Sequence, residues 1–360
     1  MVVVLNSGSS SLKVSLFEDG KLVQHLLYEN ITSHQESLED FLKKIAVTKI
    51  EVVIHRVVHG GEEFFEPTKI DALSLKKLKT LNHLAPLHNP ANLLAIEYFF
   101  EHYPTMMQYV VFDTAFFHHL PDVTKYYAID KTLAKRHHIR RYGFHGSSHA
   151  YLSQEAQKLL GKTPDLITLH LGGGCSICAI NQGKAVDISM GFTPLEGLMM
   201  GSRSGDVDAG VVLYLQRECG MDVDEVEHFL NKECGLFGVC GEREFVTILE
   251  QQEQNKEYKL AYEMFVYRII KYIGSYFAIM PRCDALVFSG GIGEHSSKLR
   301  ADVLQRLEHF GIAYDKQKNL QNEIDISSTK SHIKVFVIPT DEEKYMYESV
   351  MKKEKDGYRV

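Results

Sequence analysis

The feature that most constrains the fold is a pattern that occurs twice. Residues 2–16 and 166–180 each consist of two apolar stretches joined by a turn of small residues. Apolar alternation around a turn rich in glycine or serine is typical of a β-hairpin. Aligned without a gap, the two copies match Asn6 with His170, Gly8 with Gly172 and Ser11 with Cys175. The repetition favours a duplicated domain, although two generic glycine and serine hairpins can also agree by chance.

The rest of the chain alternates between strand and helix patterns, which predicts an α/β fold. With 360 residues, 44% of them hydrophobic, the chain is long enough for two domains. Further strands are predicted at 21–29, 51–59, 108–113, 184–189, 284–289 and 334–340. Helices are predicted at 35–45, 74–82, 91–102, 148–160 and 256–280, with a closing helix capped by Asp341.

Composition narrows the class of partner. The net charge is −7 and no lysine- or arginine-rich block occurs, which disfavours nucleic acid. No signal-peptide pattern and no apolar run of about 18 residues is present, so we expect a cytoplasmic protein without a membrane partner. The six cysteines have no framework spacing and are expected to be reduced thiols. Cys175 and Cys178 match C-x-x-C, but no second pair follows to favour a metal or redox site.

The two small-residue turns indicate a phosphate ligand. Backbone N–H groups of glycine and serine can converge on one anion, and the hydroxyls add donors. Neither turn is a Walker loop, because G-x-x-x-x-G-K-[ST] is absent from both. The glycines at 290–293 follow a predicted strand and offer a third close approach to a ligand, or merely a tight turn.

Charged residues near predicted strand ends are the remaining candidates. Arg56 lies inside an apolar strand, so it needs a carboxylate or an anionic ligand, and a structural salt bridge is the simpler interpretation. Arg203 lies between small residues that expose its guanidinium to a ligand. His145 and His149 are four apart, a spacing that metal sites use, but no adjacent glutamate completes a zinc motif.

These residues carry a close resemblance to short-chain acyl kinases, the acetate kinase family of the sugar kinase, Hsp70 and actin superfamily. The matching motifs follow the family's order from residue 2 to residue 343. They are LNSGSSSLK, HRVVHGGE, APLHNP, VFDTAF, RRYGFHGSSH, HLGGGCSI, DISMGFTPLEGLMMGSRSGDVD, FSGGIGEHS and PTDEE.

The resemblance implies two duplicated ribonuclease-H-like domains with mixed sheets flanked by helices and a cleft between them. Residues 1–115 would form the first domain, with a C-terminal helix at about 343–360 packing back on it, and 116–342 the nucleotide-binding domain. It also implies ATP or ADP as co-substrate, Mg²⁺ with Mn²⁺ as a substitute, and a homodimer. In the family's reaction the acyl carboxylate attacks the γ-phosphoryl of ATP in line, so catalysis depends on positioning and charge stabilisation.

Roles carry over residue by residue from the family. The catalytic residues would be Arg56, Asp113, His145 and Arg203. The acyl pocket, which Arg56 also borders, would be formed by Val58, Leu87, Phe144 and Pro194. The nucleotide contacts would be Ser9, Ser11, Lys13, His170, Gly172, Gly173, Gly174, Arg243, Gly290, Gly291, Ile292 and Gly293. Asn6 and Glu342 would hold the Mg²⁺ shell, directly or through water.

The size of Val58 bears on substrate choice. A β-branched valine leaves little room for a longer acyl chain, so acetate is expected to be preferred over propionate. One methylene discriminates by only ~1 to 3 kcal/mol, so propionate is expected to react more slowly. The alternatives are a propionate or butyrate kinase and a non-catalytic member that senses acetyl phosphate or nucleotide.

Three positions depart from the usual acetate kinase pattern. Gly173 replaces an asparagine that would donate to the phosphates, as in butyrate kinases. His295 stands where asparagine is usual, and Gly241 stands where an aspartate commonly contacts the ribose. The chain is also short for the family, and the missing residues are expected between Lys13 and Arg56. Nucleotide affinity is therefore harder to predict than the reaction.

Overall fold

The computed structural model describes residues 1–8, 11–29, 31 and 33–357. The chain divides into two compact units. Unit 1 consists of Met1–His118, His145–Tyr151 and the C-terminal segment from Asp341. Unit 2 consists of His119–Phe144 and Leu152–Thr340. The segments His145–Tyr151 and Asp341–Glu342 are thus grouped with unit 1, whereas the family resemblance implies a second domain over 116–342.

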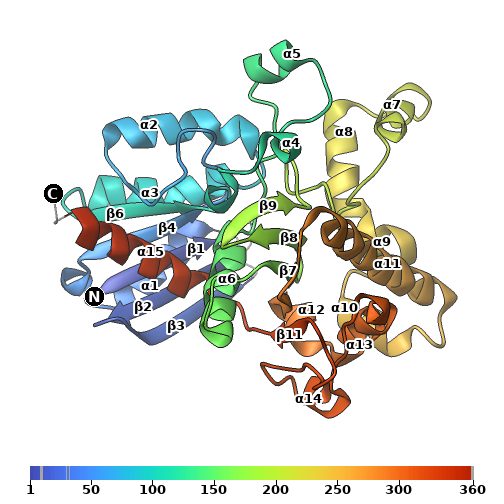
Figure 1. Cartoon of the computed structure of the whole chain (residues 1–360). Helices are drawn as coiled ribbons and strands as arrows, with labels where there is room; N and C mark the ends of the chain where they lie inside the picture. Colours follow the sequence, from blue (N-terminus) through green and yellow to red (C-terminus); the bar gives the residue numbers. More distant parts are fainter. Residues whose placement is uncertain (9–10, 30, 32, 358–360) are drawn as a thin grey trace. The chain divides into compact units, whose positions relative to one another are not determined.

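Unit 1 is built on one mixed sheet in the order β3-β2-β1-β4-β6-β5 (Figure 1). Its strands are β1 (Val2–Ser7), β2 (Ser11–Glu18), β3 (Lys21–Glu29), β4 (Val52–Val57), β5 (Thr68–Lys69) and β6 (Met107–Phe112). The unit's main helices are α1 (His34–Lys44), α2 (Ala72–Thr80), α3 (Asn89–His102) and α15 (Glu342–Gly357). β1 is antiparallel to β2 and parallel to β4, and β4 is parallel to β6.

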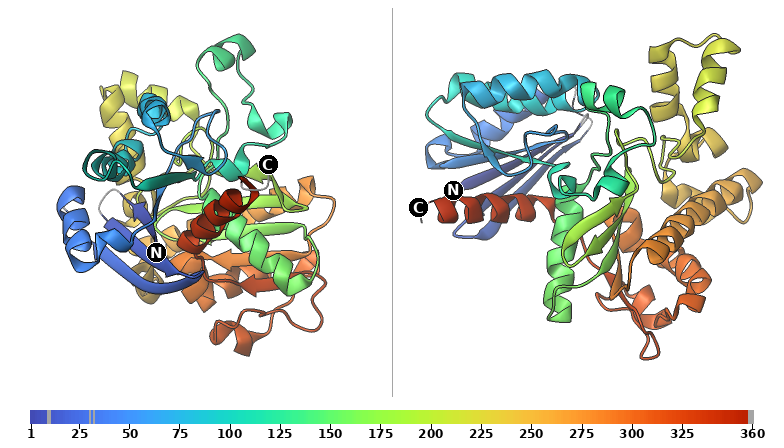
Figure 2. Two further views of the ribbon diagram at one scale, coloured as in Figure 1. Left: turned by 90° about the vertical axis from the view of Figure 1, so that its left-hand side faces the viewer. Right: turned by 45° about the horizontal axis from the view of Figure 1, so that its top comes forward.

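Both faces of the unit 1 sheet are covered. Residues Val2–Leu5 of β1 are all apolar, so the strand presents apolar side chains to both faces. Val3 and Leu5 pack with Phe41 of α1 and Phe99 of α3 in one buried cluster. Val2 and Val4 pack on the other face against α15, whose Met346 is fully buried. Figure 2 shows α15 running beneath the blue strands. α15 starts after Asp341, whose carboxylate accepts from the Lys344 N–H at 2.9 Å, as the sequence predicted.

Unit 2 has a second mixed sheet in the order β11-β10-β7-β8-β9. Its strands are β7 (Leu166–Leu171), β8 (Cys175–Asn181), β9 (Lys184–Ile188), β10 (Ala285–Ser289) and β11 (Lys334–Val337). Its helices are α4 (Asp122–Lys125), α5 (Lys131–Arg136), α7 (Ala209–Arg217), α8 (Val223–His228), α9 (Gly235–Cys240), α10 (Phe245–Gln251), α11 (Lys256–Ile279), α12 (Gly290–His295), α13 (Ser297–Arg306) and α14 (Lys316–Leu320). α6 (Gly146–Leu160) begins in the segment of unit 1 that holds His145 and continues into unit 2.

The two sheets share one topology. β3-β2-β1-β4-β6 in unit 1 corresponds to β9-β8-β7-β10-β11 in unit 2, and every pairing has the same orientation. The predicted duplication is therefore confirmed. β5 is an addition to the edge of the unit 1 sheet, where it pairs antiparallel with β6.

The gapless alignment of the two hairpins is wrong by one residue in the second strand. Ser7 pairs with Leu12, so the first turn encloses residues 8–11. Leu171 pairs with Cys175, so the second turn encloses only residues 172–174. Cys175 is consequently the equivalent of Leu12, and not of Ser11. The second turn, made of glycine alone, is therefore one residue shorter than the first.

Sheet register also matches the strand ends of the two units. With Asn6 equivalent to His170, the neighbouring parallel strands make Arg56 equivalent to Ser289. One strand further, Asp113 is equivalent to Thr340. The carboxyl ends of parallel strands meet at one edge of a sheet, which is where α/β folds bind ligands.

Candidate active site

The buried centre of the unit 1 edge is an ion pair between Arg56 and Asp113. Nε and Nη2 of Arg56 donate to the two carboxylate oxygens of Asp113 at 2.9 and 2.5 Å. The Arg56 side chain is 16% exposed and that of Asp113 is 2% exposed. Burial alone would lower the pKa of Arg56, but the facing carboxylates of Asp113 and Glu342 outweigh it and raise that pKa. The salt-bridge interpretation of Arg56 is therefore confirmed, with Asp113 as the partner, and its role toward an anionic ligand stays a prediction.

Asn6, at the end of β1, links this ion pair to the start of α15. Its Oδ1 accepts from Nη1 of Arg56 at 2.9 Å, and its Nδ2 donates to Glu343 at 2.9 Å and to Glu342 at 3.5 Å. The sequence pattern missed Glu343. The acidic pair that follows Asp341 was its only signal, and a helix start explains that pair equally well.

The carboxyl group of Glu342 has a raised pKa. Burial, followed by repulsion from Asp113 and Glu343, raises its pKa to about 7, against the attraction of Arg56 and Lys13. Three carboxylates thus gather around one guanidinium, with Lys13 exposed on β2. This excess of negative charge, with an amide oxygen beside it, is the donor chemistry that suits a divalent cation. Among the described residues, no group of three or more His, Cys, Asp or Glu side chains is arranged to hold a metal by itself.

His145 has a strained backbone. Its φ is +60°, in the left-handed region that non-glycine residues seldom adopt. The next residue, Gly146, donates its N–H to the carbonyl of Asp113 at 2.9 Å. A Cβ on Gly146 would lie 2.1 Å from that oxygen, so only glycine fits. His145 is therefore held beside the strand end that carries Asp113, within unit 1.

In unit 2 the edge of the sheet opens into a pocket of about 450 Å³. The predicted nucleotide residues that line it are Gly172, Gly173, Arg243, Gly291 and Ile292, together with His295. The sequence pattern missed its apolar wall, formed by Leu236, Phe245, Val246 and Leu249. The apolar face of α10 was the only signal for that wall, and such a face more often packs into a core.

The glycines around this pocket differ in why a side chain is absent. Gly290 has φ +76°, and a Cβ there would lie 2.6 Å from the Leu171 carbonyl oxygen, so no other residue fits. It opens helix α12, so the glycines at 290–293 do not form merely a tight turn. Gly173 faces open space, and a Cβ at this position would have no neighbouring atom within 4 Å. Gly241 has φ +75° and ends α9, which gives its departure from aspartate a structural reason.

Arg203 contrasts with Arg56. Its Nη1 donates to the carbonyl of Pro194 at 3.3 Å and lies 3.9 Å from Sδ of Met200. Burial lowers the pKa of Arg203, and within the described part of the chain no carboxylate forms an ion pair with it. A buried guanidinium without a carboxylate is costly unless an anion binds to it.

The remaining predicted residues are placed as follows. Ser9 lies outside the described residues. Ser11 and Lys13 lie on β2, and His170, Gly174 and Gly293 lie at the edge of the unit 2 sheet or in α12. Of the proposed acyl pocket, Val58 and Leu87 belong to unit 1, and Phe144 and Pro194 to unit 2. Val58 and Phe144 are buried, whereas Leu87 is 46% exposed.

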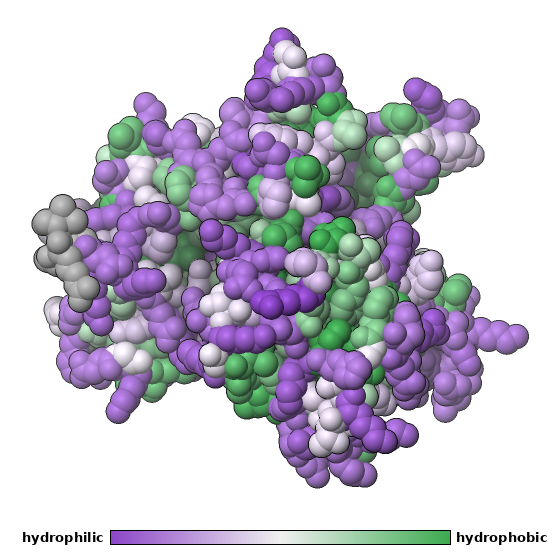
Figure 3. Space-filling view, viewed as in Figure 1, coloured by the Kyte–Doolittle hydropathy of each residue, from purple (hydrophilic) through white to green (hydrophobic). Residues whose placement is uncertain are grey.

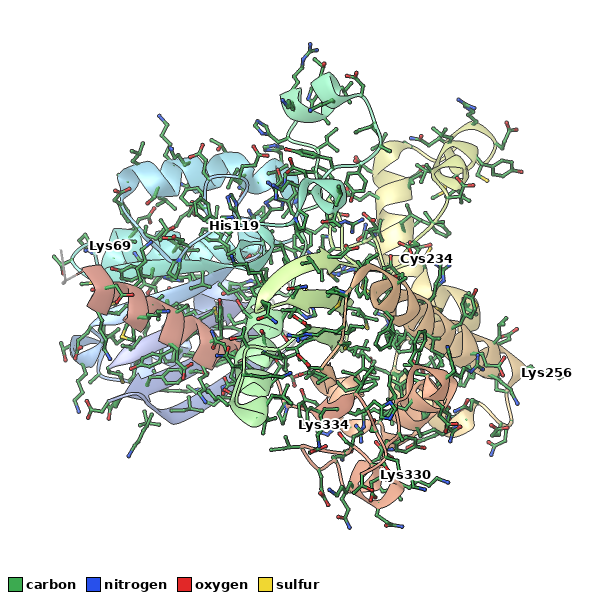
Figure 4. The ribbon with its side chains drawn as sticks, viewed as in Figure 1. Lys69, His119, Cys234, Lys256, Lys330 and Lys334 are labelled. Carbon is green, nitrogen blue, oxygen red and sulfur yellow. The ribbon has the colours of Figure 1, made fainter. Side chains whose placement is uncertain are left out.

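Burial disfavours the thiolate form of most of the cysteines. Cys175 and Cys178 are buried in β8, and burial raises the pKa of the Cys175 thiol to about 12. Cys234, labelled in Figure 4 just before α9, is half-buried, and burial raises its thiol pKa as well. No helix among the described residues is both long and apolar enough to span a bilayer.

A duplicated mixed sheet, a glycine-lined pocket at one sheet edge and arginines beside it define a phosphotransferase of the actin, Hsp70 and sugar kinase class. The model of the Acetokinase family matches residues 23–348, and the chain belongs to this family.

Relatives and solved structures agree over nearly the full length. The chain is 43% identical to the acetate kinase of Sulfurovum sp. (strain NBC37-1), covering 95% of this chain and 96% of that protein. It is 37% identical to the crystal structure of Porphyromonas gingivalis acetate kinase, with a TM-score of 0.89 and 98% of each chain covered. A propionate kinase from Francisella tularensis is 38% identical, with a TM-score of 0.91, covering 97% of this chain and 98% of that one.

Proposed function

We propose that the protein catalyses the reversible transfer of the γ-phosphoryl group of ATP to acetate, giving acetyl phosphate and ADP. The observation that carries the proposal is the half-buried guanidinium of Arg203, which lacks a carboxylate partner in the described chain. A transferring phosphoryl group concentrates charge on its equatorial oxygens, and a planar guanidinium meets two of them at once. Gly201 and Ser202, just before Arg203, line the pocket assigned to ATP, which supports this role.

Each catalytic group has a distinct proposed task. Arg203 and His145 stabilise the phosphoryl group in flight by donating hydrogen bonds to its oxygens. Asp113 holds the fork of Arg56 by two hydrogen bonds, so Arg56 keeps one orientation toward the carboxylate of acetate. The acetate oxygen is the nucleophile, so the protein needs no activated side chain.

The proposed metal site is the carboxylate of Glu342 with Asn6 beside it. Mg²⁺, or Mn²⁺ in its place, supplies charge neutralisation of the phosphates when bound. The amide oxygen of Asn6 accepts from Arg56, so Asn6 reaches the metal shell through water. Burial, with repulsion from Asp113 and Glu343, raises the pKa of Glu342, and a bound cation would offset both effects.

We place ATP in the glycine-lined pocket of unit 2, with its adenosine against Gly291 and Ile292. The phosphates would meet the turn at Gly172, and the family resemblance implies Ser9, Ser11 and Lys13 as further phosphate contacts. Gly173 offers no side-chain donor, so the second turn binds through its backbone.

Acetate is the proposed acyl substrate because Val58, which the family resemblance assigns to acyl binding with Leu87, Phe144 and Pro194, is buried and β-branched. Propionate is the second candidate, favoured by the similarity to the Francisella tularensis propionate kinase. The two substrates differ by one methylene, worth ~1 to 3 kcal/mol, so a quantitative preference is expected.

A homodimer in the cytoplasm completes the proposal. Helix α7 has no buried residue although its sequence is largely apolar, and Val211, Leu213 and Tyr214 are 42%, 47% and 61% exposed. Figure 3, in the same view as Figure 1, shows apolar side chains (green) at the upper right, where Figure 1 draws α7 and α8. A second copy packing on α7 removes this apolar area from water.

One assay tests the function directly. Hydroxylamine traps acyl phosphate, and its formation is measured with acetate, propionate and butyrate, each with ATP, GTP and pyrophosphate. We expect the highest kcat/KM with acetate and ATP. A higher value for butyrate would contradict the pocket assigned to Val58. No acyl phosphate with any pair, together with retained nucleotide binding, would leave the sensing protein as the function.

A further inference from the structure

Two asparagines of helix α3 hold the backbone at the edge of the unit 1 sheet. Asn89 and Asn92 belong to the first turn of α3 and are 0% and 2% exposed. Asn92 Nδ2 donates to the Ser7 carbonyl at 2.6 Å, and its Oδ1 accepts from the Val58 N–H at 3.1 Å. Asn89 makes both of its hydrogen bonds to the backbone of His59, at 3.0 and 3.1 Å.

The position of Asn92 explains why its side chain is buried there. The parallel pairing of β1 with β4 ends at Leu5 and His55, while β4 continues to pair with β6 as far as Val57. Beyond Leu5 the two strands no longer share backbone hydrogen bonds. The side-chain amide of Asn92 offers both a donor and an acceptor, as a peptide group does, and it bridges the two strands at this point.

The two backbone groups that Asn92 bridges belong to segments that we propose bind different substrates. Ser7 directly precedes the turn that begins at Gly8, which we assign to the phosphates. Val58 is the residue we assign to the acyl pocket. We infer that Asn92 is a positioning residue that sets the separation between the phosphate turn and the acyl pocket wall. The inference rests on the proposed function for what those two segments bind.

A second contact helps to isolate this role. Nε2 of His34, the first residue of α1, donates to the Gly8 carbonyl at 2.7 Å. His34 thus holds the phosphate turn without contacting Val58, whereas Asn89 holds the backbone beside Val58 without contacting the turn. Asn92 holds both, so three variants separate the two effects.

The test uses Asn92→Asp, Asn89→Asp and His34→Ala in the full chain. Asn92→Asp keeps the acceptor for Val58 but places a carboxylate oxygen against the Ser7 carbonyl. We expect its KM for ATP to rise about tenfold and the acetate-to-propionate ratio of kcat/KM to change severalfold. His34→Ala should raise the KM for ATP alone. Asn89→Asp should change the acyl ratio while its KM for ATP stays within about twofold of the wild type.

The outcomes separate this inference from the proposed function. If Asn92→Asp lowers the melting temperature but keeps both the wild-type KM for ATP and the wild-type acyl ratio, Asn92 only packs the fold and the inference is wrong. Where Asn92→Asp does not fold, Asn92→Ala is assayed with added formamide, which supplies the missing amide. Recovery of the KM for ATP supports the inference, and no recovery contradicts it. A wild-type protein that forms no acyl phosphate overturns the proposed function instead.

Discussion

The two units place different chemistry at the same positions of one duplicated sheet. In unit 1 the ends of β1, β4 and β6 carry Asn6, Arg56 and Asp113, which form one hydrogen-bonded group. The equivalent positions of unit 2 hold His170, Ser289 and Thr340. There β10 runs directly into the glycines of α12.

The difference teaches how a duplicated fold separates two tasks. Charged side chains fill the edge in unit 1, which we propose binds the reacting groups. Glycines leave the edge in unit 2 open to a ligand as large as a nucleotide. Arg203 of unit 2 lies in a loop and has no carboxylate partner in the described chain, whereas Arg56 of unit 1 is paired with Asp113.

Removing the unpaired arginine tests the sharpest part of this comparison. Arg203→Ala should lower kcat by two to three orders of magnitude, because it removes charge stabilisation of the transferring phosphoryl group. Affinity for ATP, measured by calorimetry, should change little. The free energy of unfolding should not fall, since no ion pair is lost. Unchanged turnover would remove Arg203 from the site.

Removing Asp113, the carboxylate partner of Arg56, should instead lower the free energy of unfolding. Asp113→Asn keeps the shape of the side chain but removes the carboxylate that holds Arg56 by two hydrogen bonds, which leaves only the more weakly interacting Glu342 and Glu343. The free energy of unfolding in urea should fall by about 3 kcal/mol. Glu66→Gln is the matched control in the same unit, because its pair with Lys353 is 63% and 44% exposed and should contribute less than about 1 kcal/mol. Equal losses in the two variants would contradict the buried pair.

The cores of the two sheets differ in pH dependence. Register makes His55 equivalent to Phe288 and Gln108 equivalent to Val335. Burial lowers the pKa of His55 to about 3 from 6.5, against its hydrogen bond to Gln108. As the pH falls from 6.5 to about 3, the unfolded chain gains a proton at His55 and the folded protein does not. This residue therefore reduces stability by about 1.4 kcal/mol per pH unit in that range.

Copying the unit 2 residues into unit 1 should remove that dependence. The double variant His55→Phe with Gln108→Val replaces the buried polar pair by apolar side chains together, so no partner is left unsatisfied. Urea unfolding between pH 4 and pH 8 should show a flatter stability profile than the wild type. An identical slope in both proteins would show that His55 titrates normally in the folded state.

The smallest expected effect concerns the second turn. A side chain at Gly173 faces open space, so Gly173→Asn should fold normally and add a donor toward the phosphates. One hydrogen bond of about 1 kcal/mol would tighten ATP binding roughly fivefold. Gly290→Asn should instead destabilise unit 2, because its Cβ would meet the Leu171 backbone at 2.6 Å. Weaker ATP binding by Gly173→Asn would contradict the assigned position of the phosphates.

Much of this fold could be predicted from local pattern. Every strand and long helix expected from apolar periodicity is present, with ends shifted by a few residues, as for β4, which stops at Val57. The duplication was also predictable, because both hairpins keep the same alternation. Their one-residue difference in turn length was not, because a gapless match between small residues fits either register until strand pairing fixes it.

The candidate site, like the fold, was predictable from the sequence only in part. The sequence by itself determined which residue types were available: arginines that need an anion, glycines that let a ligand approach and carboxylates that suit a cation. Only the tertiary structure decided that Asp113 is the partner of Arg56, that Glu343 contacts Asn6, and that Asn92 bridges Ser7 and Val58. These partners are 34 to 337 residues apart in the chain. No local preference records such pairs, because they arise from the crossing of strands at a sheet edge and the packing of helices over it.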